Sequence, residues 1–170
     1  MFYKDTNGNV IAEVIDNYLP GHTADKIEEH FLSTLPYWNY QSQITLKSGT
    51  GEDAFFASVI WKQPEGIITR EFELLIPIIE QLNNKALLRI KANLFLATDV
   101  LHIHRPHQDY TFNHKSGVYY VNDNDGYTQV GDHKIESVKN RFLVFDGSND
   151  HNSTNCTSAP SRVTLNFCWL

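Results

Sequence analysis

Three side chains suited to binding a metal ion stand out in this 170-residue sequence. His107 and Asp109 are two residues apart, and residues two apart on an extended strand project to the same face. His151 lies far downstream and could approach them from another strand. Two imidazoles and one carboxylate can occupy one face of a borderline metal ion and leave its remaining positions open. The spacing therefore predicts a metal site formed by His107, Asp109 and His151.

An arginine with the right setting to bind a carboxylate follows this group. Apolar and polar side chains alternate over residues 162–167, so that Arg162, Thr164 and Asn166 share one face of a predicted strand. A polar row inside a β-core is costly unless it contacts ligands, and a guanidinium binds a carboxylate through two parallel hydrogen bonds. We therefore predict that Arg162 anchors a carboxylate with support from Thr164. The alternative is a surface arginine on an edge strand.

Four segments carry a family resemblance when they are taken in this order along the chain. They are His107-Gln108-Asp109, Gly117-Val118-Tyr119-Tyr120-Val121-Asn122, Asn140-Arg141-Phe142-Leu143-Val144-Phe145-Asp146-Gly147, and His151 with Ser161-Arg162-Val163-Thr164-Leu165-Asn166-Phe167. Together they resemble the 2-oxoglutarate/Fe(II) dioxygenase superfamily, and most of all its prolyl 4-hydroxylase branch. The resemblance covers about residues 93–168.

The resemblance implies an enzyme and assigns roles to particular residues. His107, Asp109 and His151 would bind Fe(II), and Arg162 would hold the far carboxylate of the cosubstrate 2-oxoglutarate. Dioxygen would be consumed, with ascorbate as an optional reductant, to hydroxylate a substrate C–H bond and release succinate and CO2. The substrate it suggests is a prolyl residue in a peptide or protein.

Two further cosubstrate contacts follow from the same resemblance. Tyr120 matches a family tyrosine whose hydroxyl donates to 2-oxoglutarate; the alternative is a core aromatic with an unrelated partner. Asn93 lies on the strand before the H-x-D motif, where the family commonly has a tyrosine. Phe95 and Ala97 are the other candidates for that position.

Other readings of the site remain open at this stage. His102 and His104 compete for the metal role: with His107 they form a histidine-rich run, and His104 with Asp109 faintly resembles the metal pattern of cupins, which share the jelly-roll architecture. A small metabolite is an alternative substrate, and a binding module without catalysis is an alternative function. We interpret His114, like His22, His30 and His133, as a surface residue.

The elements that must position these residues can be read from the pattern of the chain. Helices are predicted over about residues 24–33, with Thr23 as N-cap, and 74–82, with Pro77 inside. From about residue 86, short runs rich in Val, Tyr, Phe and Leu alternate with turn clusters. We expect one domain over residues 1–170, mainly β with flanking helices. Its helical support would lie mostly in 20–85, and a double-stranded β-helix (jelly-roll, cupin-like) core in about 86–170.

Bulk properties exclude some classes of function. A net charge of −6 argues against a nucleic-acid partner, which would require clustered Lys and Arg. No apolar run approaches the ~20 residues of a membrane span. No signal peptide is recognisable, so we expect a cytoplasmic protein in which Cys156 and Cys168 are reduced thiols. A strand over residues 43–46 and a loop over 48–53 that covers the site are also expected.

Overall fold

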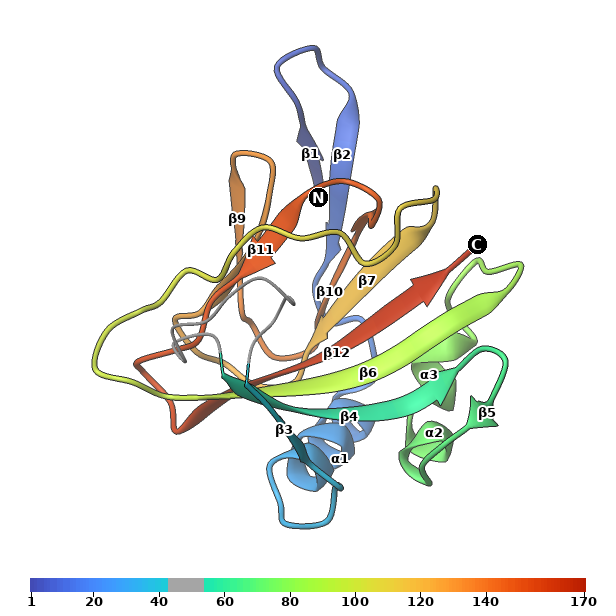
Figure 1. Ribbon diagram of the computed structural model, residues 1–170, viewed down its shortest axis with the longest axis vertical. Coiled ribbons are helices and arrows are strands. Elements are labelled where there is room, and N and C mark those ends of the chain that lie inside the picture. Colours follow the sequence, from blue (N-terminus) through green and yellow to red (C-terminus); the bar gives the residue numbers. More distant parts are fainter. Residues whose placement is uncertain (43–53) are drawn as a thin grey trace.

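The computed structural model describes residues 1–42 and 54–170 and arranges them as two β-sheets with three short helices (Figure 1). The expected strand over 43–46 and the expected loop over 48–53 lie outside the described residues. The helices are α1 (Gly21–Phe31), α2 (Glu71–Leu74) and α3 (Ile76–Ile79). The strands are β1 (Phe2–Lys4), β2 (Val10–Ile15), β3 (Asn39–Gln41), β4 (Phe55–Lys62), β5 (Gly66–Ile67), β6 (Leu87–Leu96), β7 (Lys115–Tyr120), β8 (Tyr127–Val130), β9 (His133–Glu136), β10 (Arg141–Asp146), β11 (His151–Ser153) and β12 (Ser161–Trp169).

The two sheets differ in size. Within the described residues, the larger sheet has nine strands in the order β1-β2-β10-β7-β12-β6-β4-β3, with β5 paired to β4. The smaller sheet has three strands in the order β11-β8-β9. All strand pairs are antiparallel, and β12 is paired on both sides, with β6 and with β7. A jelly roll of two antiparallel sheets is what the strand pattern predicted, and this prediction is confirmed.

The large sheet buries its two faces against different partners. One face packs on α1, α2 and α3, which lie together on the lower side of the sheet in Figure 1. That face carries Val163, Leu165 and Phe167, so the alternation predicted over residues 162–167 is confirmed. On the other face, Val118, Leu143 and Phe145 pack against Val130 and Ile135 of the small sheet. The space between the sheets therefore contains an apolar core. Beside this core lies the cavity described below.

The helices differ from the sequence prediction in their boundaries. Helix α1 begins at Gly21 and follows Pro20, with no side-chain cap, so Thr23 lies inside the first turn and is not the N-cap. The second predicted helix is divided into α2 and α3, separated by Leu75. Pro77 has no N–H to continue the hydrogen-bond ladder, so the chain restarts after Leu75. Within α3, Ile78 is buried and Ile76 is 39% exposed.

The three helices of the described chain all lie within residues 20–85, where the helical support was expected. This stretch also contributes β3, β4 and β5, and β4 pairs along β6 in the middle of the large sheet. Strand β4 is buried on both faces, so its sequence Phe-Phe-Ala-Ser-Val-Ile-Trp lacks the alternation that marks a half-exposed strand.

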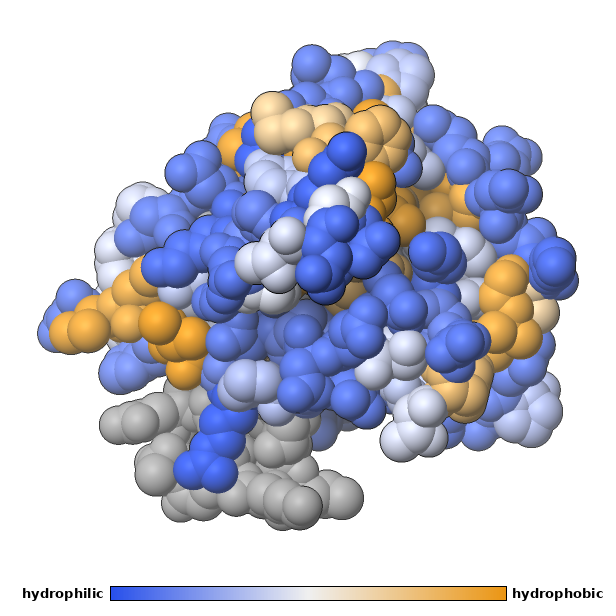
Figure 2. Space-filling view, turned by 90° about the horizontal axis from the view of Figure 1, so that it is seen from above, coloured by the Kyte–Doolittle hydropathy of each residue, from blue (hydrophilic) through white to orange (hydrophobic). Residues whose placement is uncertain are grey.

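The face seen in Figure 2 is mainly polar, as expected from a chain in which 41% of the residues are hydrophobic and 20% are charged. On this face, separate apolar patches lie between polar side chains (Figure 2). No helix in the described ranges is long and apolar enough to span a membrane.

A buried asparagine fastens the entry to α1 onto the large sheet, and its removal should be costly. Asn140, at φ 61°, accepts a hydrogen bond from the Leu19 amide at 2.9 Å and donates one to the Leu19 carbonyl at 2.8 Å. Asn140→Ala leaves both groups unpaired and places alanine in the left-handed region, so we expect a loss of roughly 2–4 kcal/mol. Urea unfolding measures this. Asn140→Gly should lose less, and the exposed Asn83→Ala almost nothing; equal losses for Asn140→Ala and Asn83→Ala would contradict the assignment.

Candidate active site

A narrow cavity lies between the two sheets, and most of the residues predicted for the site line it. Strands β6, β7 and β12 form its floor, and Thr128 of β8 with His151 and Ser153 of β11 form its roof. Its lining includes six of the seven predicted site residues: Asn93, His107, Asp109, His151, Arg162 and Thr164. Tyr120 is not part of this lining.

His107 and His151 are brought together by the backbone. The His107 amide donates to the His151 carbonyl at 2.9 Å, and the His151 amide donates back at 3.0 Å. This antiparallel bridge is isolated, so residues 107–109 are not on a regular strand as the spacing argument assumed. The segment before β7 instead runs extended past the start of β11. The backbone N–H of Asp109 donates a hydrogen bond to the Gly147 carbonyl at 3.2 Å, which fixes this residue in place.

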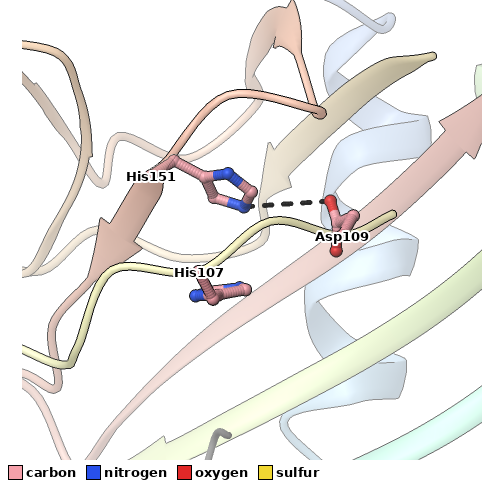
Figure 3. Close-up of side chains that lie close together, drawn as sticks. All are labelled: His107, Asp109 and His151. Carbon is pink, nitrogen blue, oxygen red and sulfur yellow. Dashed lines mark ion pairs between the residues drawn. The ribbon is translucent and has the colours of Figure 1, made fainter. Parts of the chain in front are cut away.

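The three side chains converge (Figure 3). One donor atom from each of His107, Asp109 and His151 lies within 4.8 Å of the other two. The His151 Nε2 atom faces Asp109 Oδ2 at 3.8 Å, which is too long for a hydrogen bond. The ring centroids of His107 and His151 are 4.5 Å apart. Two imidazoles and a carboxylate are therefore grouped around one point.

The tautomer of His151 suits a metal ligand. Its Nδ1–H donates to the Asn149 carbonyl at 3.0 Å, which in the neutral imidazole leaves the lone pair on Nε2. That Nε2 atom is buried and has no hydrogen-bond partner in the described chain. Burial, together with the neighbouring His151, lowers the pKa of His107 to about 4, so His107 is a neutral imidazole at pH 7. A buried unpaired nitrogen, a neutral imidazole and a carboxylate are a donor set that fits Fe(II).

The Asp109 carboxylate is held in its ionised form. Burial alone would raise the pKa of Asp109, but the nearby Arg89 guanidinium and His151 outweigh burial and hold it well below its usual range. Arg89 Nη2 donates to Oδ1 at 2.6 Å, and Ser116 Oγ donates to Oδ2 at 2.6 Å. Such outer contacts fix the orientation of a ligating carboxylate.

Arg162 is fully buried at the opposite end of the cavity floor and is held by neutral acceptors. Its guanidinium donates to Ser137 Oγ at 2.8 Å, to the Thr154 carbonyl at 3.2 Å and to Thr128 Oγ1 at 3.1 Å. These contacts use three of its five N–H donors. No carboxylate of the described residues pairs with it, although a buried cation without a counter-charge is costly. The buried Arg162 guanidinium thus has the chemistry to bind an anionic group that enters the cavity.

The supporting cosubstrate residues lie in different settings. Thr164 and Asn93 are cross-strand partners on the cavity floor, and the buried Asn93 Oδ1 has no hydrogen-bond partner in the described chain. Tyr120 packs in the apolar core between the sheets, where its hydroxyl donates to the Ile135 carbonyl at 3.4 Å. Its ring lies 5.7 Å from the Arg162 guanidinium carbon. The Tyr120 ring therefore packs against the Arg162 guanidinium without lining the cavity. A direct contact between Tyr120 and 2-oxoglutarate stays a prediction.

The other histidines of this region are separated from the three converging side chains. In the described chain, neither group of potential metal ligands contains His102 or His104. His104 is buried, with its Nδ1 atom 3.1 Å from Ser153 Oγ. His114 is only 5% exposed, so its interpretation as a surface residue was wrong. It lies behind Asp109, next to Ser116 and Gly147, where a side chain at Gly147 would collide with both.

Sequence reasoning missed two cations, Arg89 and Lys91. Both lie on β6 at positions that alternate with Ile90 and Ala92 of the helix-facing core, and Asn93 continues the same polar row. The alternation that identified the polar face of residues 162–167 is also present in Arg89, Lys91 and Asn93, and could have located them.

No protein-family model matches the sequence, and no curated protein matches it. Solved structures do resemble it. A prolyl hydroxylase from Trichoplax adhaerens, in complex with a peptide fragment of the hypoxia inducible factor oxygen degradation domain, superposes with a TM-score of 0.67 at 11% identity, over 94% of this chain and 83% of that one. A Pseudomonas putida prolyl-4-hydroxylase gives 0.59 at 13% identity, over 93% and 91%. The chain has the fold of the 2-oxoglutarate/Fe(II) oxygenases.

This fold is compatible with more than one reaction. A non-heme alpha ketoglutarate dependent epimerase, SnoN from nogalamycin biosynthesis, superposes with a TM-score of 0.61 at 10% identity, over 94% of this chain and 77% of that one. The match to these three solved structures confirms the double-stranded β-helix fold that the sequence predicted. Function must be argued from the site.

Proposed function

We propose that this protein is a non-haem Fe(II) and 2-oxoglutarate-dependent dioxygenase that hydroxylates a substrate C–H bond. The observation that carries the proposal is the convergence of His107, Asp109 and His151 on one point, with the His151 Nε2 atom buried and unpaired among the described residues. Three ligands on one side of a metal leave open positions for a chelating cosubstrate and dioxygen.

The residues of the chain would hold and orient the reacting groups. Fe(II) with bound 2-oxoglutarate and O2 supplies the oxidation, and the co-products are succinate and CO2. His107 and His151 would present neutral imidazoles, while Arg89 and Ser116 keep the Asp109 carboxylate ionised and oriented. Arg162 would bind the far carboxylate, supported by Thr164 and Asn93. Ascorbate would serve only to keep the iron reduced.

Cosubstrate entry requires side chains to move. The cavity volume is about 40 Å³, which is smaller than a dicarboxylic acid. Phe55 and Lys91 line both this cavity and a larger groove outside it, so they form its mouth. Rotation of these two side chains would open the cavity, and the apolar Phe55 and Phe95 would then exclude water from the bound cosubstrate.

A cupin-like metal site is not favoured by the geometry. It would require His102 or His104 to join His107 and Asp109, whereas the third converging ligand is His151. We propose that His104 instead supports β11 through Ser153.

The proposal is tested by anaerobic titration of the protein with Fe(II) and then 2-oxoglutarate, monitored by visible absorption. We expect a charge-transfer band that saturates at one equivalent of each. Substitution of succinate for 2-oxoglutarate should give no band, because succinate lacks the keto oxygen needed for chelation. Absence of the band with 2-oxoglutarate would sink the proposal and favour a metal-binding module.

For the substrate, we propose a prolyl residue in a peptide or protein, with a small metabolite as the alternative. Mass spectrometry of a panel of proline-containing peptides, free amino acids and small acids decides between them through a gain of about 16 mass units, one oxygen atom. Oxygen gain on a prolyl ring supports the prolyl proposal. Gain only on small molecules would contradict it and leave the oxygenase chemistry standing.

A further inference from the structure

Lys91 is a cation at the cavity mouth that pairs with no carboxylate of residues 1–42 and 54–170. It lies in the middle of β6, between Val59 of β4 and Asn166 of β12 in register. Its ammonium lies 5.4 Å from the Phe55 ring centroid, and it forms no ion pair with the described residues. Burial, and to a smaller extent the nearby Arg89 guanidinium, lower the pKa of Lys91 to about 8, so the side chain remains mainly charged at pH 7.

The charges around the cavity do not balance. Asp109 is the only carboxylate in the cavity lining formed by the described residues, and Arg89 already pairs with it. Two lining cations, Arg162 and Lys91, therefore have no carboxylate partner in the described part of the chain. The proposed cosubstrate has one carboxylate for Arg162 and one that chelates the metal. Neither of these two carboxylates is available to pair with Lys91, although the protein as a whole has a net charge of −6.

A groove outside the cavity gives Lys91 access to a larger molecule. It has a volume of about 780 Å³, runs along the outer edge of β4 and shares Phe55 and Lys91 with the cavity. Exposed apolar side chains line it, with Tyr37 78% and Ile68 48% exposed. Its one described carboxylate, Glu71, is already engaged by His30 at 3.1 Å and lies 3.8 Å from Arg70 Nε. Among the described residues, Lys91 is thus the cation that lines both the groove and the cavity, whereas Arg70 lines the groove alone.

We propose that Lys91 binds a carboxylate of the substrate, so that the preferred substrate is an acid that reaches the metal site through the β4 groove. This assignment rests on the proposed oxygenase function. A lysine ammonium pairs with a carboxylate as a point charge, and pairing at a half-buried site is stronger than at the open surface. The carboxylate can come from an acidic side chain beside the target residue of a peptide or from the free carboxyl group of a small acid.

The experiment compares wild type with Lys91→Met, Lys91→Arg and, as a matched control for loss of a surface lysine, Lys85→Met. Each protein is first titrated anaerobically with Fe(II) and 2-oxoglutarate. Each is then assayed with two substrate pairs that differ in one charge. The first pair is acetyl-Ala-Glu-Pro-Ala-amide and its Gln counterpart; the second is N-acetylproline and its amide. Succinate formation and oxygen gain are both recorded.

We expect the acidic member of at least one pair to be preferred by wild type about tenfold or more in kcat/KM, the scale of one charged hydrogen bond. Lys91→Met should remove this preference by raising KM for the acid alone, Lys91→Arg should retain most of it, and Lys85→Met should behave as wild type. The pair that responds tells whether the carboxylate belongs to a side chain or to a small acid.

Several results would overturn the assignment of Lys91. They are equal use of acid and amide by wild type, a preference that survives in Lys91→Met, oxygen gain by no acidic member, or a charge-transfer band lost specifically in Lys91→Met. The last result would make Lys91 a cosubstrate ligand. A band missing from wild type would instead reject the oxygenase proposal, so the two failures are distinguishable.

Discussion

Replacement of His151 by alanine is expected to abolish tight Fe(II) binding while the protein stays folded. The loss should exceed the about 10–100-fold reduction in metal affinity that mutation of an outer-shell partner causes, because a direct ligand is removed. The bridge between His107 and His151 is formed by backbone atoms and survives in the variant. The lost ring contact with Phe145, at 4.7 Å, should cost only a few degrees in melting temperature.

Metal competition against a chromophoric chelator measures this effect, with circular dichroism to confirm folding. His107→Ala should behave in the same way. His104→Ala is the matched control, because His104 is a buried histidine on the same segment that does not converge with the three predicted ligands. If His104→Ala lost the metal and His151→Ala kept it, the ligand set would be misassigned and the cupin-like reading would return.

The parts of the fold that sequence could predict are those in which one face of a strand is apolar. Over residues 162–167 the apolar positions pack on the helices and the polar positions line the cavity, as the alternation predicted. The same periodicity holds at Tyr119 and Tyr120, which point to opposite faces of β7. Arg141, at the start of β10, forms an ion pair with Asp16 at 2.6 Å.

What sequence could not predict depends on contacts between distant segments. Strand β4 is buried on both faces and carries no period-two signal, so its place beside β6 is decided by pairing alone. The H-x-D segment is oriented by the bridge to His151 and by the Gly147 carbonyl, and not by a strand of its own. The role of Arg89 becomes visible only when Asp109, 20 residues away in sequence, lies against it.

Arg162 should set the affinity for 2-oxoglutarate without affecting the metal. Arg162→Ala removes the one buried guanidinium of the cavity lining, and loss of hydrogen bonds to a charged group should weaken 2-oxoglutarate binding by ~2–3 kcal/mol. Fe(II) affinity should change little, because the three predicted metal ligands do not include Arg162. Anaerobic titration of the charge-transfer band with 2-oxoglutarate gives the dissociation constant directly.

The design must separate cosubstrate binding from folding, because Arg162 also bonds Ser137, Thr154 and Thr128. Arg162→Lys keeps the positive charge but cannot form the two-pronged contact, so it should bind 2-oxoglutarate with an affinity between those of wild type and Arg162→Ala. Arg141→Ala removes a different arginine, paired with Asp16 outside the cavity, and should leave the dissociation constant unchanged. A folded Arg162→Ala protein with wild-type affinity for 2-oxoglutarate would remove Arg162 from this role, and the anion site would have to be sought at Lys91.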